Sequence, residues 1–288
     1  TMPGRCAAPP APAMMTRSPR SAAALTARRS KAGKPDAASI STASASGQFG
    51  PFVPEPGRPI WLTLSGTWSG TVTVLEARTG RVLAMATAPT FDPNNYLGAN
   101  KDDMGNRPVS EIYEPGSTGK VLTMSAVLEE GKAKPTSRMT VPPVLNRGGH
   151  TTHDHTDHGT LHLTLNGVLA ESSNIGTILF TDRIGGEKLY EYQRKFGMGQ
   201  ETGLNFPGES KGVLPAYKNW SQTTFPTLVF GQGMSVNTVQ AASVYATIAN
   251  DGVGVTPSLI DSVTAPDGTV TPGAATKETV VVSPKTAK

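Results

Sequence analysis

The pattern of apolar and polar positions divides the chain near residue 58. Residues 1–57 are rich in Ala, Ser, Pro and Arg, contain few large apolar side chains and show no periodicity. Such a segment cannot bury enough apolar surface to offset the entropy that it loses on ordering. We therefore expect residues 1–57 to form a disordered basic tail and residues 58–288 to form the folded part of the chain.

The folded part begins with a short strand expected at residues 61–64, and two further β-rich runs follow at residues 71–76 and 81–86. Residues 77–80 separate them and end in Gly80, which can supply the positive φ that a tight turn needs. The pattern predicts an antiparallel hairpin.

Helical spacing of apolar residues begins at Ser117 and continues to Gly131. Shorter helical stretches and one late extended run follow, at residues 165–171, 175–184, 238–249 and 279–282. Strand pairs therefore alternate with helices, and the sequence contains no internal repeat, which predicts an α/β or α+β domain.

Charge and cysteine content limit the function classes. The formal net charge is +4, but residues 1–57 hold seven of the 26 Lys and Arg and only two of the 22 Asp and Glu. The remaining residues are nearly neutral and lack the basic footprint of a nucleic-acid-binding protein, so we expect no nucleic-acid partner.

Cys6 is the one cysteine, which rules out an internal disulfide. No apolar run predicts a membrane anchor or an export signal in this chain.

Candidate chemistry is concentrated at residues 117–120, Ser-Thr-Gly-Lys. Ser117 is the one serine in the sequence with a lysine three residues later. Because a helix turns once in 3.6 residues, the side chains of Ser117 and Lys120 share a face and can hydrogen-bond. A serine hydroxyl needs an adjacent base to act as a nucleophile, and a lysine serves as that base only when its pKa is lowered. The motif therefore indicates a nucleophile and a buried base, although an isolated S-x-x-K is more often a serine N-cap followed by a surface lysine.

The residues around this motif carry a family resemblance. Residues 113–120, Tyr-Glu-Pro-Gly-Ser-Thr-Gly-Lys, resemble the first active-site block of class B penicillin-binding proteins, and residues 171–176, Glu-Ser-Ser-Asn-Ile-Gly, are similar to their second, S-x-N, block. Further matches lie at residues 88–94, 202–209, 231–233, 240–242 and 249–252. The resemblance covers about residues 71–288 and implies the penicillin-binding protein/serine β-lactamase-like transpeptidase fold, a mixed antiparallel sheet with helices, here incomplete.

The resemblance also implies a mechanism. Ser117 would attack the D-Ala-D-Ala carbonyl of a peptidoglycan stem peptide, and Lys120 would accept its proton. Ser172 would relay a proton to the leaving D-alanine, and Asn174 would bind the substrate amide and hold Lys120. The backbone N–H of Ser117 would be one oxyanion donor.

Partners and location follow from the same resemblance. β-Lactam antibiotics would imitate the dipeptide and trap Ser117, and no cofactor is expected. The partners would be the stem peptide, β-lactams and proteins of a cell-wall synthesis or division complex. The parent protein would act at the extracytoplasmic face of a bacterial membrane. Proteins of this family usually begin with a membrane-spanning helix and a pedestal domain, and we recognise neither in this sequence.

The third block of the family, Lys-Thr-Gly or a close variant, is missing from the sequence. Lys285-Thr286-Ala287 and Arg78-Thr79-Gly80 resemble it only superficially. Ser235-Val236-Asn237 matches S-x-N, but it opens the helical stretch at residues 238–249, where an N-cap is the favoured interpretation. We therefore expect a partial transpeptidase domain.

All five histidines lie within residues 150–162, with Asp154 and Asp157 between them. Their spacing matches no familiar zinc pattern, so we expect a polar, solvated loop and no metal site.

Two other functions stay open. A related serine hydrolase, such as a β-lactamase or D,D-carboxypeptidase, shares S-x-x-K but must direct a water at the acyl-enzyme, and no specific deacylating carboxylate is evident. A non-catalytic penicillin-binding fold, kept for cell-wall assembly, would tolerate loss of the third block. Trapping of penicillin, its rapid turnover or the absence of acylation distinguishes the three functions.

Overall fold

The computed structural model describes residues 23–25, 38–42, 60–62 and 70–288. The expected tail, residues 1–57, lies outside the described residues apart from the short strands β1 (Ala23–Leu25) and β2 (Ala38–Thr42). Strand β3 (Ile60–Leu62) pairs with β1. The predicted boundary near residue 58 stays a prediction.

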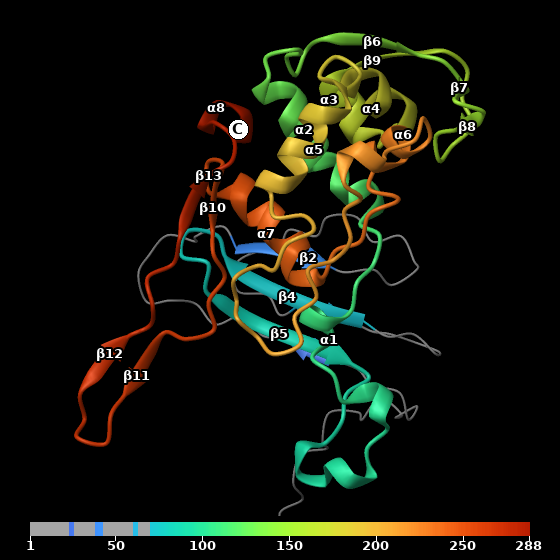
Figure 1. Cartoon of the computed structure of the whole chain (residues 1–288). Helices are drawn as coiled ribbons and strands as arrows, with labels where there is room; N and C mark the ends of the chain where they lie inside the picture. The colour runs from blue at the N-terminus through green and yellow to red at the C-terminus, as the bar shows by residue number, and fades with distance from the viewer. Residues whose placement is uncertain (1–22, 26–37, 43–59, 63–69) are drawn as a thin grey trace, which may run out of the picture.

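An antiparallel sheet in the order β2-β4-β5 lies below the main cluster of helices in the view of Figure 1. Strands β4 (Gly70–Glu76) and β5 (Val82–Ala88) form the predicted hairpin, and Gly80 in its turn has a φ of +73°. Val74 and Leu75 of β4 are buried. The hairpin prediction is therefore confirmed.

Helix α7 (Thr238–Ala249) covers one face of this sheet and coincides with the predicted helical stretch. Its Ala242 and Ala246 pack against Leu75 and Ala77 of the hairpin. Because alanine side chains are small, they allow a helix to lie close to a sheet. α7 thereby forms the layer between the sheet and the helices α2, α3, α4, α5 and α6, which lie within residues 120–229 (Figure 1).

A cluster of helices lies on the far side of α7 from the sheet. Helix α2 (Lys120–Glu129) runs through its centre and contacts the helices around it, α3 (Leu165–Ala170), α4 (Asn174–Thr181) and α5 (Gly185–Lys195). Residues 122–127 of α2 are all buried, as expected of a helix that is surrounded by protein. α2 and α3 lie within the predicted helical stretches and α4 begins one residue before its predicted stretch, whereas α5 was not predicted.

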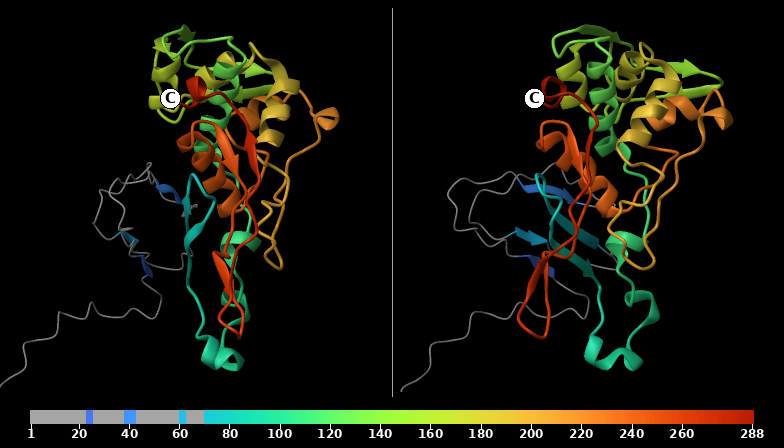
Figure 2. Two further views of the ribbon diagram at one scale, coloured as in Figure 1. Left: turned by 90° about the vertical axis from the view of Figure 1, so that its left-hand side faces the viewer. Right: turned by 60° about the vertical axis from the view of Figure 1, so that its left-hand side comes forward.

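The other elements are short. Three helices are α1 (Arg107–Ser110), α6 (Thr224–Val229) and α8 (Pro284–Ala287). Four 3-10 turns are η1 (Pro93–Gly98), η2 (Lys101–Asp103), η3 (Gly116–Gly119) and η4 (Tyr217–Asn219). The antiparallel pairs are β6 (Arg138–Val141) with β9 (Leu161–Thr164), β7 (Leu145–Arg147) with β8 (His150–Thr152), β10 (Val253–Val255) with β13 (Glu278–Val280), and β11 (Ser262–Thr264) with β12 (Val270–Pro272). The β11-β12 hairpin projects away from the helices (Figure 2).

This arrangement is the expected mixed fold of an antiparallel sheet covered by helices. The late extended run, predicted at residues 279–282, is strand only to Val280, because Ser283 then caps the N-terminus of α8. Asn237 is the N-cap of α7. Its Oδ1 accepts from the N–H of Gln240 at 2.8 Å, and the Gln240 Oε1 accepts from the Asn237 N–H at 2.8 Å. The interpretation of Ser235-Val236-Asn237 as a helix N-cap is therefore confirmed.

Replacing this cap tests how much it stabilises the fold. Asn237 is fully buried, and its Nδ2 also donates to the Ser210 carbonyl at 2.8 Å. We expect Asn237→Ala to lower the free energy of unfolding by about 2–4 kcal/mol, since it removes a cap and leaves buried backbone groups unpaired. Urea unfolding followed by circular dichroism measures the change. Thr164→Ala, which removes the simpler cap of α3, should cost only about 1 kcal/mol. Equal costs for the two variants would contradict the assignment.

Candidate functional site

Ser117 lies on a 3-10 turn, η3, that leads directly into α2. Gly116 before it has a φ of +53°, which produces the sharp entry that Pro115 and Gly116 predict. The side chain of Thr118 donates back to the Pro115 carbonyl at 2.7 Å and tightens the turn. Ser117 itself is exposed. The candidate nucleophile therefore faces solvent at the N-terminal end of a buried helix.

A loop from a distant part of the sequence holds this turn in place. The N–H of Gly116 donates to the Gly231 carbonyl at 2.9 Å, and the Glu114 carboxylate accepts from the N–H of Gly233 at 2.8 Å. The phenol of Tyr245, on α7, donates to the Thr118 carbonyl at 3.0 Å. The turn is thus fixed on two sides, by residues 231–233 and by α7.

Lys120 is completely buried. Its Nζ donates to Asn174 Oδ1 at 2.7 Å, to the Ser172 hydroxyl at 3.1 Å and to the Ser172 carbonyl. Burial lowers the pKa of Lys120 to about 8, against the opposing effect of the Asp154 carboxylate. An amine with this pKa is partly deprotonated at neutral pH and can then accept a proton, as a general base must.

The structure joins three of the four predicted site residues by hydrogen bonds. Lys120, Ser172 and Asn174 meet although 52 and 54 residues separate them along the chain. The Ser117 hydroxyl is not among the Nζ partners, so the expected Ser117 to Lys120 hydrogen bond is not formed. The reason is that Ser117 lies on the 3-10 turn with its side chain exposed, while the carbonyl and hydroxyl of Ser172 both reach the buried amine.

The backbone of Ser172 explains how one residue offers two acceptors to the same amine. Its φ is +54°, in the left-handed region that residues other than glycine seldom adopt. Ser173, which follows, is the N-cap of α4 and accepts from the N–H of Gly176 at 2.8 Å. A positive φ at a residue other than glycine, as at Ser172, persists only where the surrounding structure imposes it, and such backbone strain is common at functional sites.

The histidine-rich segment lies against this site. Asn174 Nδ2 donates to the His153 carbonyl at 3.0 Å. The side chains of His158 and Asp154 are only 13% and 8% exposed and lie 3.0 Å apart. The prediction of a merely solvated loop is therefore wrong for this pair, because Asp154 also accepts from the N–H of Ile175 at the N-terminus of α4. In the described part of the chain, no group of three or more His, Cys, Asp or Glu side chains is arranged to hold a metal ion.

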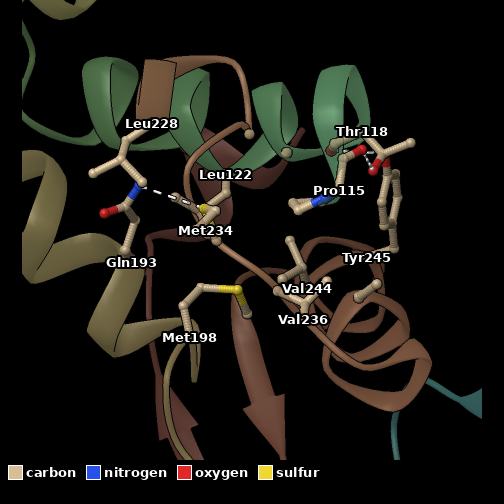
Figure 3. A pocket seen from close by; sticks show the side chains of 13 residues that line it. Pro115, Thr118, Leu122, Gln193, Met198, Leu228, Met234, Val236, Val244 and Tyr245 are labelled. Atoms are coloured by element: carbon tan, nitrogen blue, oxygen red, sulfur yellow. Dashed lines mark hydrogen bonds between the residues drawn. The ribbon is translucent and has the colours of Figure 1, made fainter. Parts of the chain in front are cut away.

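An apolar cavity lies behind the nucleophile turn, between α2 and α7 (Figure 3). Its free volume is about 20 Å³, which is room for little more than one water. The wall includes Leu122, Met198, Leu228, Met234 and Val244. Because its walls are apolar and it is so small, this cavity is packing space and not a substrate site.

The look-alike of the third block lies far from Ser117. Lys285 and Thr286 belong to α8, and the Thr286 hydroxyl donates to the Glu129 carboxylate at 2.6 Å. Glu129 is the last residue of α2, about 14 Å along the helix from Lys120 at 1.5 Å per residue. Lys285-Thr286-Ala287 is therefore not a wall of this site.

The sequence analysis did not assign Tyr245, Gly231 or Asp154 to the site. These residues act through contacts with residues far away along the chain. Residues 231–233 were noticed only as a family match, and nothing local predicts that they hold Ser117.

Comparison with known proteins gives consistent matches. Residues 70–288 match the family described as "Penicillin binding protein transpeptidase domain". Penicillin-binding protein PbpB of Mycolicibacterium smegmatis is 44% identical over 225 residues, which cover 78% of this chain and 35% of the relative. Peptidoglycan D,D-transpeptidase FtsI of Escherichia coli is 37% identical over 186 residues, 64% of this chain and 31% of the relative.

A solved structure supports the same assignment of the fold. Penicillin binding protein 3 of Mycobacterium tuberculosis, in complex with aztreonam, superposes with a TM-score of 0.73 at 44% identity, over 76% of this chain and 49% of that one. This chain thus spans about a third of the length of the curated relatives. In the part of the sequence that the structure describes, no helix is both long and apolar enough to cross a membrane.

The close approach of Gly231 to the nucleophile turn can be tested with a matched pair of glycines. Gly231 has a φ of +80°, and a Cβ there would lie 2.2 Å from the Gly116 carbonyl oxygen. Gly131 has a φ of +64° and nothing within 4 Å of such a Cβ. We expect Gly131→Ala to cost about 1 kcal/mol and Gly231→Ala at least about 3 kcal/mol of unfolding free energy, since only the latter pushes two backbones apart.

Hydrogen exchange of residues 114–119, read by mass spectrometry, adds a local measurement. Exchange should become faster in Gly231→Ala and not in Gly131→Ala. Equal exchange in the two variants would show that the loop does not hold the turn.

Proposed function

Because the chain belongs to the penicillin-binding protein transpeptidase family, we propose that it is a D,D-transpeptidase domain, a serine acyltransferase that cross-links peptidoglycan stem peptides at D-Ala-D-Ala. The observation that carries the proposal is the fully buried Lys120 amine, held by Ser172 and Asn174 one turn after Ser117. A buried amine with a pKa of about 8 is the base that a serine nucleophile needs.

The first step forms an ester on Ser117. The Ser117 Oγ attacks the carbonyl carbon of the penultimate D-alanine, and its proton passes to the Lys120 Nζ. The C–N bond to the terminal D-alanine then breaks, and Ser172, 3.1 Å from the Nζ, relays a proton to the leaving nitrogen. In the second step an amine of a neighbouring stem attacks the ester, the new amide forms and the Ser117 hydroxyl is restored.

Charge that develops on the substrate oxygen needs donors that are already in place. The N–H groups on either side of Ser117 are used within the protein, Gly116 to Gly231 and Thr118 to Pro115. The N–H of Ser117 donates to no acceptor in the described part of the chain, and it lies at the positive end of α2. This supports the Ser117 N–H as one oxyanion donor. Asn174 in turn holds Lys120 through its Oδ1 and would bind the substrate amide.

The same chemistry defines the proposed ligands and partners. Penicillin binding protein 3 was solved in complexes with aztreonam and ampicillin. We extend this to the present chain, so that a β-lactam carbonyl acylates Ser117. The stem-peptide substrate is a component of the wall, so the parent protein would act at the extracytoplasmic face of the bacterial membrane, with other proteins of cell-wall synthesis or division. The assignment needs no cofactor.

Intact-mass spectrometry after incubation with benzylpenicillin tests the proposal. We expect one stable adduct per wild-type chain and none on Ser117→Ala, because the ester requires the Ser117 Oγ. An adduct that is lost within minutes, with release of hydrolysed penicillin, would favour the serine hydrolase. A folded wild-type chain that forms no adduct would favour the non-catalytic module.

The pH dependence of acylation tests the role of Lys120. Only the free amine accepts the Ser117 proton, and its pKa is lowered to about 8. The rate constant for acylation by a fluorescent penicillin should therefore rise about tenfold per pH unit between pH 6 and 7 and level off above about pH 8. Lys120→Arg should abolish the reaction because arginine stays protonated. The exposed Lys132→Arg serves as the control, and a flat profile in the wild type would exclude Lys120 as the base.

A further inference from the structure

His158 is bound at both of its ring nitrogens. Its Nε2 lies 3.0 Å from the Asp154 Oδ2, and its Nδ1 contacts the carbonyl oxygen of Gly159. A carboxylate and a carbonyl only accept hydrogen bonds, so both ring nitrogens must donate. A ring with two N–H groups is the imidazolium cation. A protonated His158 ring that pairs with the Asp154 carboxylate satisfies both contacts.

The other oxygen of Asp154 reaches the S-x-N segment. Its Oδ1 accepts from the N–H of Ile175 at 2.9 Å, in the first turn of α4. Asn174, the preceding residue, donates through its Nδ2 to the carbonyl of His153 at 3.0 Å. Two adjacent residues of the loop, His153 and Asp154, thus hold two adjacent residues of α4. Since Asn174 Oδ1 accepts from Lys120, this contact fixes the acceptor of the buried amine.

Electrostatics couple the same pair to Lys120. The Asp154 carboxylate raises the pKa of Lys120 and so opposes the effect of burial. A cation on His158 offsets part of that negative charge. The hydrogen bond to Gly159 first, and then Asp154 and Asp157, raise the pKa of His158. The charged groups that face this ring are therefore the two loop aspartates, and Lys120 lies beyond Asp154, on α2.

We propose that Asp154 and His158 are positioning residues, which fix Asn174 against Lys120 and balance the charge beside that amine. The inference rests on the proposed acyl transfer at Ser117. Asp154 and His158 of the histidine-rich segment would then support Asn174, the last residue of the S-x-N motif.

The sign of the coupling distinguishes this role from a purely structural one. His158→Gln removes the positive charge and leaves Asp154 uncompensated, so the pKa of Lys120 should rise. Asp154→Asn removes the negative charge while its Oδ1 can still accept from Ile175, so the pKa of Lys120 should fall. A residue that only stabilised the loop would not move the two values in opposite directions.

The first measurement is NMR, and it does not depend on activity. In the chain labelled with ¹⁵N-histidine, both ring nitrogens of His158 should be protonated at pH 7, and the His158 pKa should fall in Asp154→Asn. In the chain labelled with ¹³C-lysine, the Lys120 Cε signal, assigned with Lys120→Ala, gives the pKa of Lys120 in each variant. A His158 ring that is neutral at pH 7 would overturn the proposal even if His158→Gln did not fold.

The second measurement is the pH profile of acylation by a fluorescent penicillin. His158→Gln should move the profile to higher pH and slow acylation about five- to tenfold at pH 7, as expected for a pKa shift of somewhat less than one unit. Asp154→Asn should move it to lower pH. His162→Gln is the control and should leave it unchanged, because His162 is an exposed residue of β9 whose ring bonds Thr140.

The outcomes separate the two proposals. If the wild type is not acylated but the Lys120 pKa moves in opposite directions in the two variants, the positioning pair holds and the proposed function fails. If the wild type is acylated and both variants reproduce its pH profile and its Lys120 pKa, the positioning role fails and the proposed function stands.

Discussion

The structure depends on the burial of one amine. Lys120 has no exposed surface, and a lysine in such a place is tolerated only where its N–H groups find acceptors. Keeping this amine charged at neutral pH costs about 3 kcal/mol, judged from its lowered pKa. Ser172 and Asn174 provide the acceptors, and the left-handed backbone of Ser172 is part of that arrangement. The same unfavourable burial gives the amine a pKa suited to proton transfer, so here stability and chemistry have opposite requirements.

The layers of helices and sheet around Lys120 follow from the need to bury its amine. A helix that carries a buried lysine needs protein on every side, and α2 has α3, α4 and α5 around it. Ser117, the proposed nucleophile, is exposed one turn earlier, so the environment changes from solvent to buried protein within three residues. The 3-10 turn and its partner at Gly231 provide this change, because a glycine allows the two backbones to touch. The sheet and α7 support this turn from behind through Tyr245.

Much of this could be predicted from the sequence, and the rest depends on contacts that a sequence does not display. The hairpin of β4 and β5 and the helices α2, α4 and α7 were predicted because local apolar periodicity determines them. Ser117 and Lys120 were recognised from their spacing, and Ser172 and Asn174 from the family resemblance alone. Helix α5 was missed because its composition is strongly polar, Gly-Gly-Glu-Lys-Leu-Tyr-Glu-Tyr-Gln-Arg-Lys. The pairing of Asp154 with the N–H of Ile175 crosses 21 residues of loop and strand, and no pattern of residue types announces it.

The contacts that form the site span long stretches of chain, 52 residues from Lys120 to Ser172, 119 from Glu114 to Gly233 and 127 from Thr118 to Tyr245. Contacts of this kind form late, after most of the chain entropy has been lost. Until then the lysine is hydrated, keeps its ordinary pKa and remains protonated, so the serine beside it has no base. Under the proposed mechanism, Ser117 of an unfinished or unfolding chain is therefore unreactive toward β-lactams, and its reactivity appears together with the last cooperative step of folding.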